Sequence, residues 1–316
     1  MERVVFFGSP DFAVPSLEAL ISSEFKPALV VTQPDRPAGR GKKLTATPVR
    51  RLAEARGIPV LVLENFRAGG VLDRLREAAP DFFVVVSFGK IFPKEALQVA
   101  GKGNVNLHAS LLPAYRGASP INRAIVNGEP WSGVTAMEMA ETLDSGPIYL
   151  QRVVPIGPME NAGALAARLA AEGAPLVVET LRKICRDGLR PVPQPAEGVS
   201  KAPLLRKEDG LIPWEKDAVG VHNHIRGMNP WPGSFTRYRG AYLKVLEAEP
   251  FDLVPRGTPP GFIIEAGARA IVIGCGRGAV KLNGLQAEGK RPLEAARFLQ
   301  GYPLAQGEVL GRRIDG

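Results

Sequence analysis

Short apolar runs alternate with amphipathic segments through the first part of the chain. Apolar runs at residues 4–7, 28–32, 60–62 and 81–86 predict strands, and the run at 81–86 is nearly continuous, as expected of a strand covered on both faces. Between them, apolar residues recur at three- and four-residue spacing, which predicts helices at 12–21, 50–56 and 71–78. Strands that alternate with helices predict an α/β fold with a mostly parallel, doubly wound sheet.

The pattern changes at a proline-rich stretch, 188–195, which is typical of a stiff linker. Before it we expect helices at 120–126 and 162–185 and strands at 134–139 and 148–156. Beyond it, short apolar runs between glycines predict a small β-barrel, with an OB-like barrel as the leading candidate. These runs lie at 234–238, 242–246, 261–264, 270–273 and 279–282. We therefore expect an α/β domain at 1–188, a linker at 189–206 and a barrel domain at 207–316.

The composition is that of an ordinary globular protein, with 316 residues, 45% hydrophobic and 23% charged. No apolar run approaches the ~20 residues that span a bilayer, and the amino terminus shows no leader pattern, so we expect a cytoplasmic protein. Cys185 and Cys275 lie too far apart in sequence for a disulfide framework or a CxxC metal site, and we expect two buried thiols. His222 and His224 lack neighbouring ligands, so we expect no metal site.

The charge permits a polyanionic partner. The net charge is +8, and from Lys201 onward 17 Lys and Arg face 12 Asp and Glu. A Pro- and Gly-containing segment at 33–44, here called the basic loop, carries four cations: Arg36, Arg40, Lys42 and Lys43. This segment is either a solvated, mobile surface loop or a loop that binds phosphate groups.

The strongest candidate for catalysis is the stretch 104–113. Alternation along a strand puts Asn106 and His108 on one face while Val105 and Leu107 point into a core. A loop follows, so the pair lies at a carboxyl strand end, where open parallel sheets bind ligands. A structural interpretation is equally open at this point, in which Asn106 caps a turn and His108 is a half-buried core histidine.

A carboxylate in a turn-forming cluster at 142–147, Asp144, can complete this pair. Beside the His108 imidazole it would orient the ring and stabilise its protonated form, while Asn106 could donate its amide to an oxygen that gains negative charge. These are the parts for attack on a carbonyl group. No G-x-S-x-G motif occurs, so the nucleophile comes from a substrate, and 8–13 lacks the glycines of a dinucleotide site.

Six segments together resemble the methionyl-tRNA formyltransferase family. They are G-S-P-D-F-A at 8–13, Q-P-D-R-P-A-G-R-G-K-K at 33–43, N-L-H-A-S-L-L-P at 106–113, Y-R-G-A at 115–118, L-D-S-G at 143–146 and N-P-W-P at 229–232. The N-x-H, S-L-L-P and L-D-x-G set resembles folate-dependent formyl transfer enzymes. The basic loop and N-P-W-P narrow the resemblance to the transferase that acts on initiator tRNA.

The resemblance implies a Rossmann-like catalytic domain and a tRNA-binding OB-like barrel. It implies transfer of the formyl group of 10-formyltetrahydrofolate to the α-amino group of methionyl initiator tRNA, through a tetrahedral intermediate, with Asn106, His108 and Asp144 as the catalytic set. The implied folate rim consists of Phe88, Gly89, Lys90, Ile91, Phe92, Ser110, Leu111, Leu112 and Pro113. The basic loop becomes a wedge that enters the acceptor end of the tRNA.

Two other functions remain open on the sequence. A formyltransferase acting on a sugar-nucleotide amine shares the N-x-H and L-D-x-G core, although the basic loop and basic barrel argue against it. A nucleic-acid-binding protein with a vestigial catalytic domain is the other, and the intact catalytic set argues against that. We expect the protein to act as a monomer.

Overall fold

The computed structural model describes residues 2–38, 43–251, 255, 257–267 and 270–311. The chain forms two compact units. The first consists of Met1–Pro120, Ser132–Pro155 and Ala166–Pro203, and the second of Ile121–Trp131, Ile156–Leu165 and Leu204–Gly316. Each unit is described separately below.

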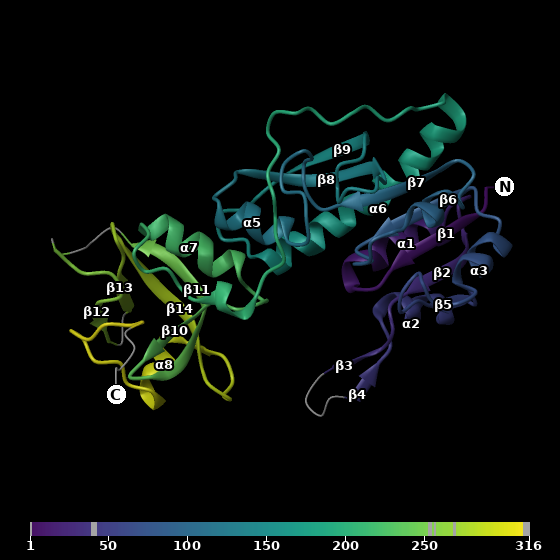
Figure 1. The fold of residues 1–316 in the computed structure, drawn as a ribbon. Coiled ribbons are helices and arrows are strands. Elements are labelled where there is room, and N and C mark those ends of the chain that lie inside the picture. Colours follow the sequence, from purple (N-terminus) through teal and green to yellow (C-terminus); the bar gives the residue numbers. More distant parts are fainter. Residues whose placement is uncertain (1, 39–42, 252–254, 256, 268–269, 312–316) are drawn as a thin grey trace. The chain divides into compact units, whose positions relative to one another are not determined.

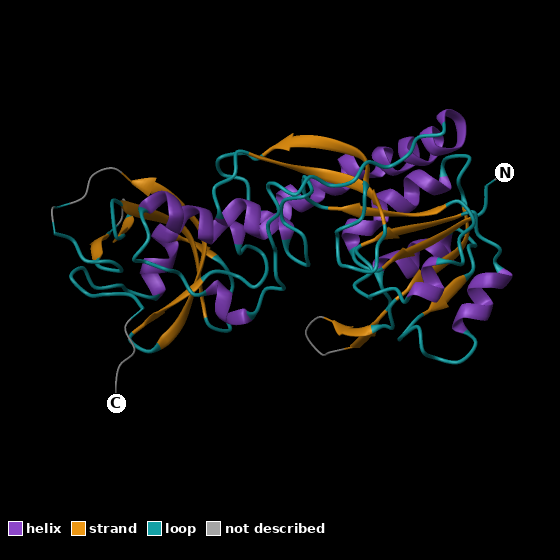
Figure 2. Cartoon of the chain, turned by 45° about the horizontal axis from the view of Figure 1, so that its top comes forward, coloured by secondary structure: helices purple, strands orange, loops and turns teal. Residues whose placement is uncertain are grey.

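The first unit is built on a seven-stranded sheet with helices on both faces (Figures 1 and 2). The strand order is β5-β2-β1-β6-β7-β8-β9. The pairs from β5 to β7 are parallel, and β8 pairs antiparallel to β7. The strands are β1 (Val4–Gly8), β2 (Pro27–Thr32), β5 (Val60–Val62), β6 (Phe82–Val86), β7 (Gly103–His108), β8 (Trp131–Glu138) and β9 (Ile148–Pro155). The predicted Rossmann-like α/β class is confirmed.

The helices of this part of the chain lie where the apolar spacing predicts them, except the short helix Lys94–Leu97, which is not predicted. They are α1 (Val14–Ile21), α2 (Pro48–Ala55), α3 (Val71–Glu77), α4 (Lys94–Leu97), α5 (Pro120–Val126) and α6 (Ala162–Asp187), and a short 3-10 turn, η1 (Asp11–Ala13), precedes α1. Capping residues determine where helices begin. Helix α2 begins at Pro48 because the Thr47 side chain accepts a hydrogen bond from the Arg50 amide and Pro48 occupies the first turn.

The two predicted buried thiols differ in exposure. Cys185 lies on α6 and is exposed, so the expectation of a buried thiol is wrong there, whereas Cys275 is buried.

The strand order creates a topological switch point between β1 and β6. The chain proceeds from β1 outward to β2 and β5, and from β6 outward in the other direction to β7, so the loops after β1 and β6 diverge. The basic loop contains a short antiparallel hairpin, β3 (Arg36–Ala38) and β4 (Lys43–Thr45), where the sequence predicts an irregular loop. Figure 1 shows this hairpin projecting from the sheet of the first unit.

The second unit is an antiparallel six-stranded sheet with helices packed on it. Its elements are η2 (Lys207–Gly210), α7 (Ala218–Gly227), β10 (Phe235–Tyr238), β11 (Ala241–Phe251), β12 (Ile263–Ala266), β13 (Ile271–Gly274), β14 (Ala279–Ala287), β15 (Leu293–Glu294) and α8 (Ala295–Gly301). Irregular registers in β11 and β12 bend the sheet into the predicted small barrel-type fold. The core includes Trp214, whose indole N–H donates to the Thr236 hydroxyl at 3.0 Å. His222 and His224 of α7 are both buried.

Candidate active site

Strand β7 delivers the two predicted polar residues to one edge of the sheet. Asn106 pairs with Val85 of β6 on one side and with Met137 of β8 on the other, so its backbone is fixed within the sheet. Its side chain is half-buried, whereas His108, two residues further along the same face, is only 6% exposed. The edge where β7 ends is the carboxyl edge of the parallel strands, as the sequence predicts.

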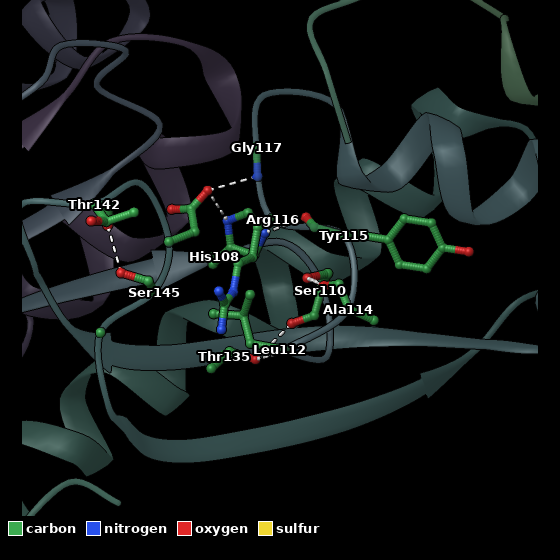
Figure 3. Close-up of polar contacts among 12 residues, drawn as sticks. His108, Ser110, Leu112, Ala114, Tyr115, Arg116, Gly117, Thr135, Thr142 and Ser145 are labelled. Atoms are coloured by element: carbon green, nitrogen blue, oxygen red, sulfur yellow. Dashed lines mark hydrogen bonds and ion pairs between the residues drawn. The ribbon is translucent and has the colours of Figure 1, made fainter. Parts of the chain in front are cut away.

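Two contacts fix the His108 ring (Figure 3). Its Nε2 lies 2.9 Å from the carbonyl oxygen of Tyr115, which can only accept a hydrogen bond, so Nε2 carries the proton. Its Nδ1 lies 3.6 Å from Oδ2 of Asp144, and both side chains are buried. Nδ1 is therefore the ring nitrogen that faces the Asp144 carboxylate, while Nε2 is engaged with the backbone.

Asp144 is held in place by its own loop. Its Oδ2 accepts a hydrogen bond of 2.8 Å from the Gly117 amide, and its backbone adopts a φ of +52°, a conformation that few non-glycine residues take. Gly146 follows, where a side chain would collide with the Glu138 carbonyl oxygen. The L-D-S-G sequence therefore allows the chain to pass close to β8 and turn the carboxylate toward His108.

The S-L-L-P turn after β7 is tightly hydrogen-bonded. The Ser110 hydroxyl donates to the Ala114 carbonyl at 2.7 Å, and Thr135 Oγ1 donates to the Ser110 carbonyl at 2.6 Å (Figure 3). Thr135 also accepts from the Leu112 amide at 3.2 Å. The side chains of Ser110 and Leu112 are thereby buried, whereas Leu111 and Pro113 remain half-buried, and the Leu112–Pro113 bond is cis.

The second predicted rim segment, 88–92, is anchored by its two ends. Phe88 and Phe92 are buried, and their rings pack edge to face against each other and against Phe7 of β1. Between them the chain is accessible: Gly89 is exposed with a φ of +70°, and Ile91 is 79% exposed. Phe88 and Phe92 therefore anchor the loop at the topological switch point between β1 and β6, and the residues between them are accessible at the surface.

Of the predicted tRNA contacts, Arg36 and Lys43 lie on the β3–β4 hairpin. Arg36 is exposed and its Nη2 donates to Gln33 Oε1 at 2.6 Å, while Lys43 begins β4. Arg40 and Lys42 lie outside the described residues. An ion pair of 3.1 Å between Asp35 and Arg50 ties the base of the hairpin to α2.

Two other features are absent from the described part of the chain, a metal-ligand cluster and a membrane-spanning helix. There, no group of three or more His, Cys, Asp or Glu side chains is arranged to hold a metal ion. None of the helices described is both long enough and apolar enough to cross a membrane.

Sequence reasoning missed the two backbone groups that orient His108 and Asp144. They are the Tyr115 carbonyl, which accepts from His108, and the Gly117 amide, which donates to Asp144. Both belong to the Y-R-G-A segment, which contributes to the family resemblance without a role of its own. The positive φ of +61° at Tyr115 and of +127° at Gly117 turns these groups inward, and the glycine was the available signal.

The chain matches two family models. Residues 2–181 match the formyl transferase model, and residues 204–303 match the formyl transferase C-terminal domain model. A methionyl-tRNA formyltransferase of Moorella thermoacetica is 45% identical over 98% of this chain and 99% of its own length. Another from Sorangium cellulosum is 46% identical over 98% of this chain and all of its own length.

Solved structures show the same fold at lower sequence identity. HypX from Aquifex aeolicus in complex with tetrahydrofolic acid superimposes with a TM-score of 0.61, at 20% identity, over 99% of this chain and 51% of that protein. The sugar 3N-formyl transferase WlaRD gives a TM-score of 0.67, at 18% identity, over 92% of this chain and 99% of that protein. At these identities the likeness concerns the fold alone.

Proposed function

This chain belongs to the methionyl-tRNA formyltransferase family, and from that premise we propose that Asn106, His108 and Asp144 carry out its reaction. The reaction transfers the formyl group of 10-formyltetrahydrofolate to the free α-amino group of methionyl initiator tRNA, which yields N-formylmethionyl-tRNA for translation initiation. The single observation that carries the assignment of roles is the 3.6 Å approach of Asp144 to His108 at the carboxyl end of β7.

The mechanism follows from the orientation of the ring. The α-amine attacks the formyl carbon, and His108 Nδ1 takes the proton that the nitrogen must lose. The Asp144 carboxylate stabilises the imidazolium, while the Asn106 amide donates to the oxyanion of the tetrahedral intermediate. Nδ1 then returns the proton to N10 of the folate as the C–N bond breaks. The 3.6 Å spacing exceeds a hydrogen bond, so Asp144 leaves Nδ1 open to the amine.

We extend the proposal to substrate binding. The folate rim comprises 110–113 together with 88–92, where the accessible Gly89 and Ile91 and the half-buried Leu111 and Pro113 are the surfaces available to a ligand. The basic loop, with its exposed Arg36, binds the phosphates of the tRNA acceptor end. The four cations of the loop's sequence, and the projection of the β3–β4 hairpin from the sheet, support this role.

The remaining elements of the proposal concern organisation. The protein acts as a monomer in the cytoplasm. Its catalytic domain comprises 1–188, its linker 189–206 and its tRNA-binding barrel 207–316. The excess of basic residues beyond Lys201 supports the assignment of tRNA binding to the barrel.

The function is tested by comparing two alternative acceptor amines as substrates. The protein is incubated with 10-formyltetrahydrofolate and either methionyl initiator tRNA or an amino-sugar nucleotide, and the formylated product is measured. We expect formylation of the tRNA alone. Formylation of the sugar but not the tRNA would replace the proposal with the sugar-nucleotide activity, and turnover of neither would favour the nucleic-acid-binding module.

A further inference from the structure

We propose that residues 192–202, here called the strap, form part of the active site and that Gln194 is a positioning residue for Asp144. The strap lies within 189–206, which the sequence assigns to a linker, between the two family matches at 2–181 and 204–303. Figures 1 and 2 show the chain after α6 running as an extended segment. The inference rests on the proposed catalytic role of Asp144.

Gln194 uses the full hydrogen-bonding capacity of its amide on the catalytic loops. Its Nε2 donates to the carbonyl oxygens of Asp144 at 2.9 Å and Gly146 at 2.7 Å. Its Oε1 accepts from Nε of Arg116 at 3.0 Å and from Nη2 of the same guanidinium at 2.7 Å. Only this orientation of the amide satisfies both sides, because guanidinium groups only donate and carbonyl oxygens only accept.

The strap also pairs with the loop that orients His108. The Arg116 amide donates to the Ser200 carbonyl at 2.9 Å, and the Ala202 amide donates to the Arg116 carbonyl at 2.7 Å. The Tyr115 amide donates to the Ser200 hydroxyl at 2.8 Å. Gly117 passes so close to the Ala202 carbonyl that a side chain would collide with it. The strap is therefore hydrogen-bonded to the 115–117 loop, whose Tyr115 carbonyl contacts His108 and whose Gly117 amide contacts Asp144.

The exposure of the strap distinguishes these contacts from incidental packing. Most of its residues are exposed, as in an ordinary linker, whereas Gln194 and Ser200 are half-buried and Ala202 is fully buried. Val192 is exposed, yet its backbone pairs with Ile148 at the start of β9 through hydrogen bonds of 2.7 and 2.8 Å. The segment is thus fixed by backbone pairing near its two ends and by one inward amide between them.

The consequence for catalysis concerns the geometry of the catalytic pair. Asp144 has a left-handed backbone conformation, which persists only where surrounding contacts determine it. Gln194 bonds the carbonyl of that residue while the Gly117 amide bonds its carboxylate, so the two contacts set the distance to His108. Loss of the Gln194 donors lets the loop relax and moves the carboxylate away from Nδ1, with no substrate contact removed.

The test uses the whole protein and two substitutions of Gln194. Gln194→Ala removes all four hydrogen bonds, and Gln194→Glu keeps the acceptors for Arg116 but turns a carboxylate oxygen toward two carbonyl oxygens. The matched controls are Glu197→Ala and Glu197→Gln, at an exposed position of the same strap. Steady-state formyl transfer is measured with each substrate varied, and hydrogen exchange of the Gly117 amide is measured alongside.

We expect kcat to fall about 10- to 100-fold in both Gln194 variants, because displacement of a catalytic group by about 1 Å has effects of that order. The KM values for both substrates should stay within about threefold of the wild type, because uniform binding is untouched. Exchange of the Gly117 amide should accelerate. The Glu197 variants should match the wild type in all three measurements.

A double-mutant cycle with Asp144→Asn separates positioning from general destabilisation. If Gln194 acts through the Asp144 carboxylate, Gln194→Ala should change kcat less than about twofold in the Asp144→Asn background. Full additivity, or kcat of wild-type size in the single Gln194 variants, would overturn the inference. Absence of formyl transfer by the wild type would instead overturn the proposed function, and the Gly117 exchange would still report whether the strap holds the loop.

Discussion

Substitution of Asp144 by Asn tests the electrostatic part of the mechanism most directly. Asparagine has nearly the same size, and its Oδ1 can still accept the hydrogen bond that Asp144 Oδ2 accepts from the Gly117 amide at 2.8 Å. The fold of the loop is therefore retained while the negative charge beside His108 is removed. In the proposed mechanism the imidazole gains its charge by taking the amine proton, so this carboxylate would stabilise the transition state more than the ground state.

The expected magnitude follows from the distance between the two groups. At 3.6 Å, a carboxylate and an imidazolium attract each other by about 4 to 5 kcal/mol at an effective dielectric constant of about 20. Since each 1.36 kcal/mol changes a rate about tenfold, the ceiling is a loss of about three orders of magnitude in kcat. Water and loop relaxation recover part of this energy, and we expect a loss of about 100-fold.

The assay is single-turnover formyl transfer to methionyl initiator tRNA with both substrates saturating, followed across pH. Thermal unfolding and folate binding serve as controls and should match the wild type. A rate within about threefold of the wild type, in a folded variant that binds folate, would refute the electrostatic role of Asp144. An equal loss of transfer and of folate affinity would assign the residue to substrate binding instead.

Three further outcomes follow from the structure. His108→Ala should lower kcat by about 100-fold or more while folate affinity changes little, because general acid–base catalysis is worth about 10²–10⁴-fold. Kinetics measures the rate and calorimetry the folate affinity. Equal losses in rate and affinity would contradict the assigned role. Neutralising the four cations of the basic loop should weaken tRNA binding and reduce the slope of log affinity against log salt by about 0.7 to 0.9 per lost phosphate contact. The slope is measured by filter-binding titrations at several salt concentrations. An unchanged slope would contradict the proposed role of the basic loop in tRNA binding. Burial lowers the pKa of His224 from 6.5 to about 4, so the unfolded state binds this proton first and the free energy of unfolding should fall by up to about 3 kcal/mol as pH drops from about 6.5 to 4. Urea unfolding of His224→Gln should show a flatter pH dependence than the wild type over that range, and parallel curves would contradict the assignment.

The sequence predicts the fold and the strand that carries Asn106 and His108 because their signals are local. Period-two alternation places Asn106 and His108 on one face, and apolar runs locate the strands of the doubly wound sheet within a few residues. The predicted approach of Asp144 to His108 is also present, at ion-pair distance. Residue type and neighbouring residues carry the first two predictions, whereas the approach of Asp144, 36 positions beyond His108, is supported by the L-D-S-G motif of the family resemblance.

The remaining features depend on contacts between distant parts of the chain. Phe88 and Phe92 read as rim residues in the sequence, yet the aromatic cluster around Phe7 buries both rings. Gln194 joins groups 48 to 78 positions away, and an amide among prolines has no periodicity or motif that marks it. The β3–β4 hairpin likewise forms in a segment whose Pro and Gly content predicts an irregular loop.

The division of the chain into two units has a consequence for its synthesis. The segments Ile121–Trp131 and Ile156–Leu165 belong to the second unit, although the rest of that unit begins only at Leu204. At about 5–20 residues per second, they emerge from the ribosome on the order of ten seconds before their partners are complete. During this interval apolar side chains in these segments, such as Ile125, which is fully buried in the finished protein, lack the rest of the second unit. The second unit therefore completes its packing only after its last segment has been synthesised, whereas all segments of the first unit have been made by Pro203.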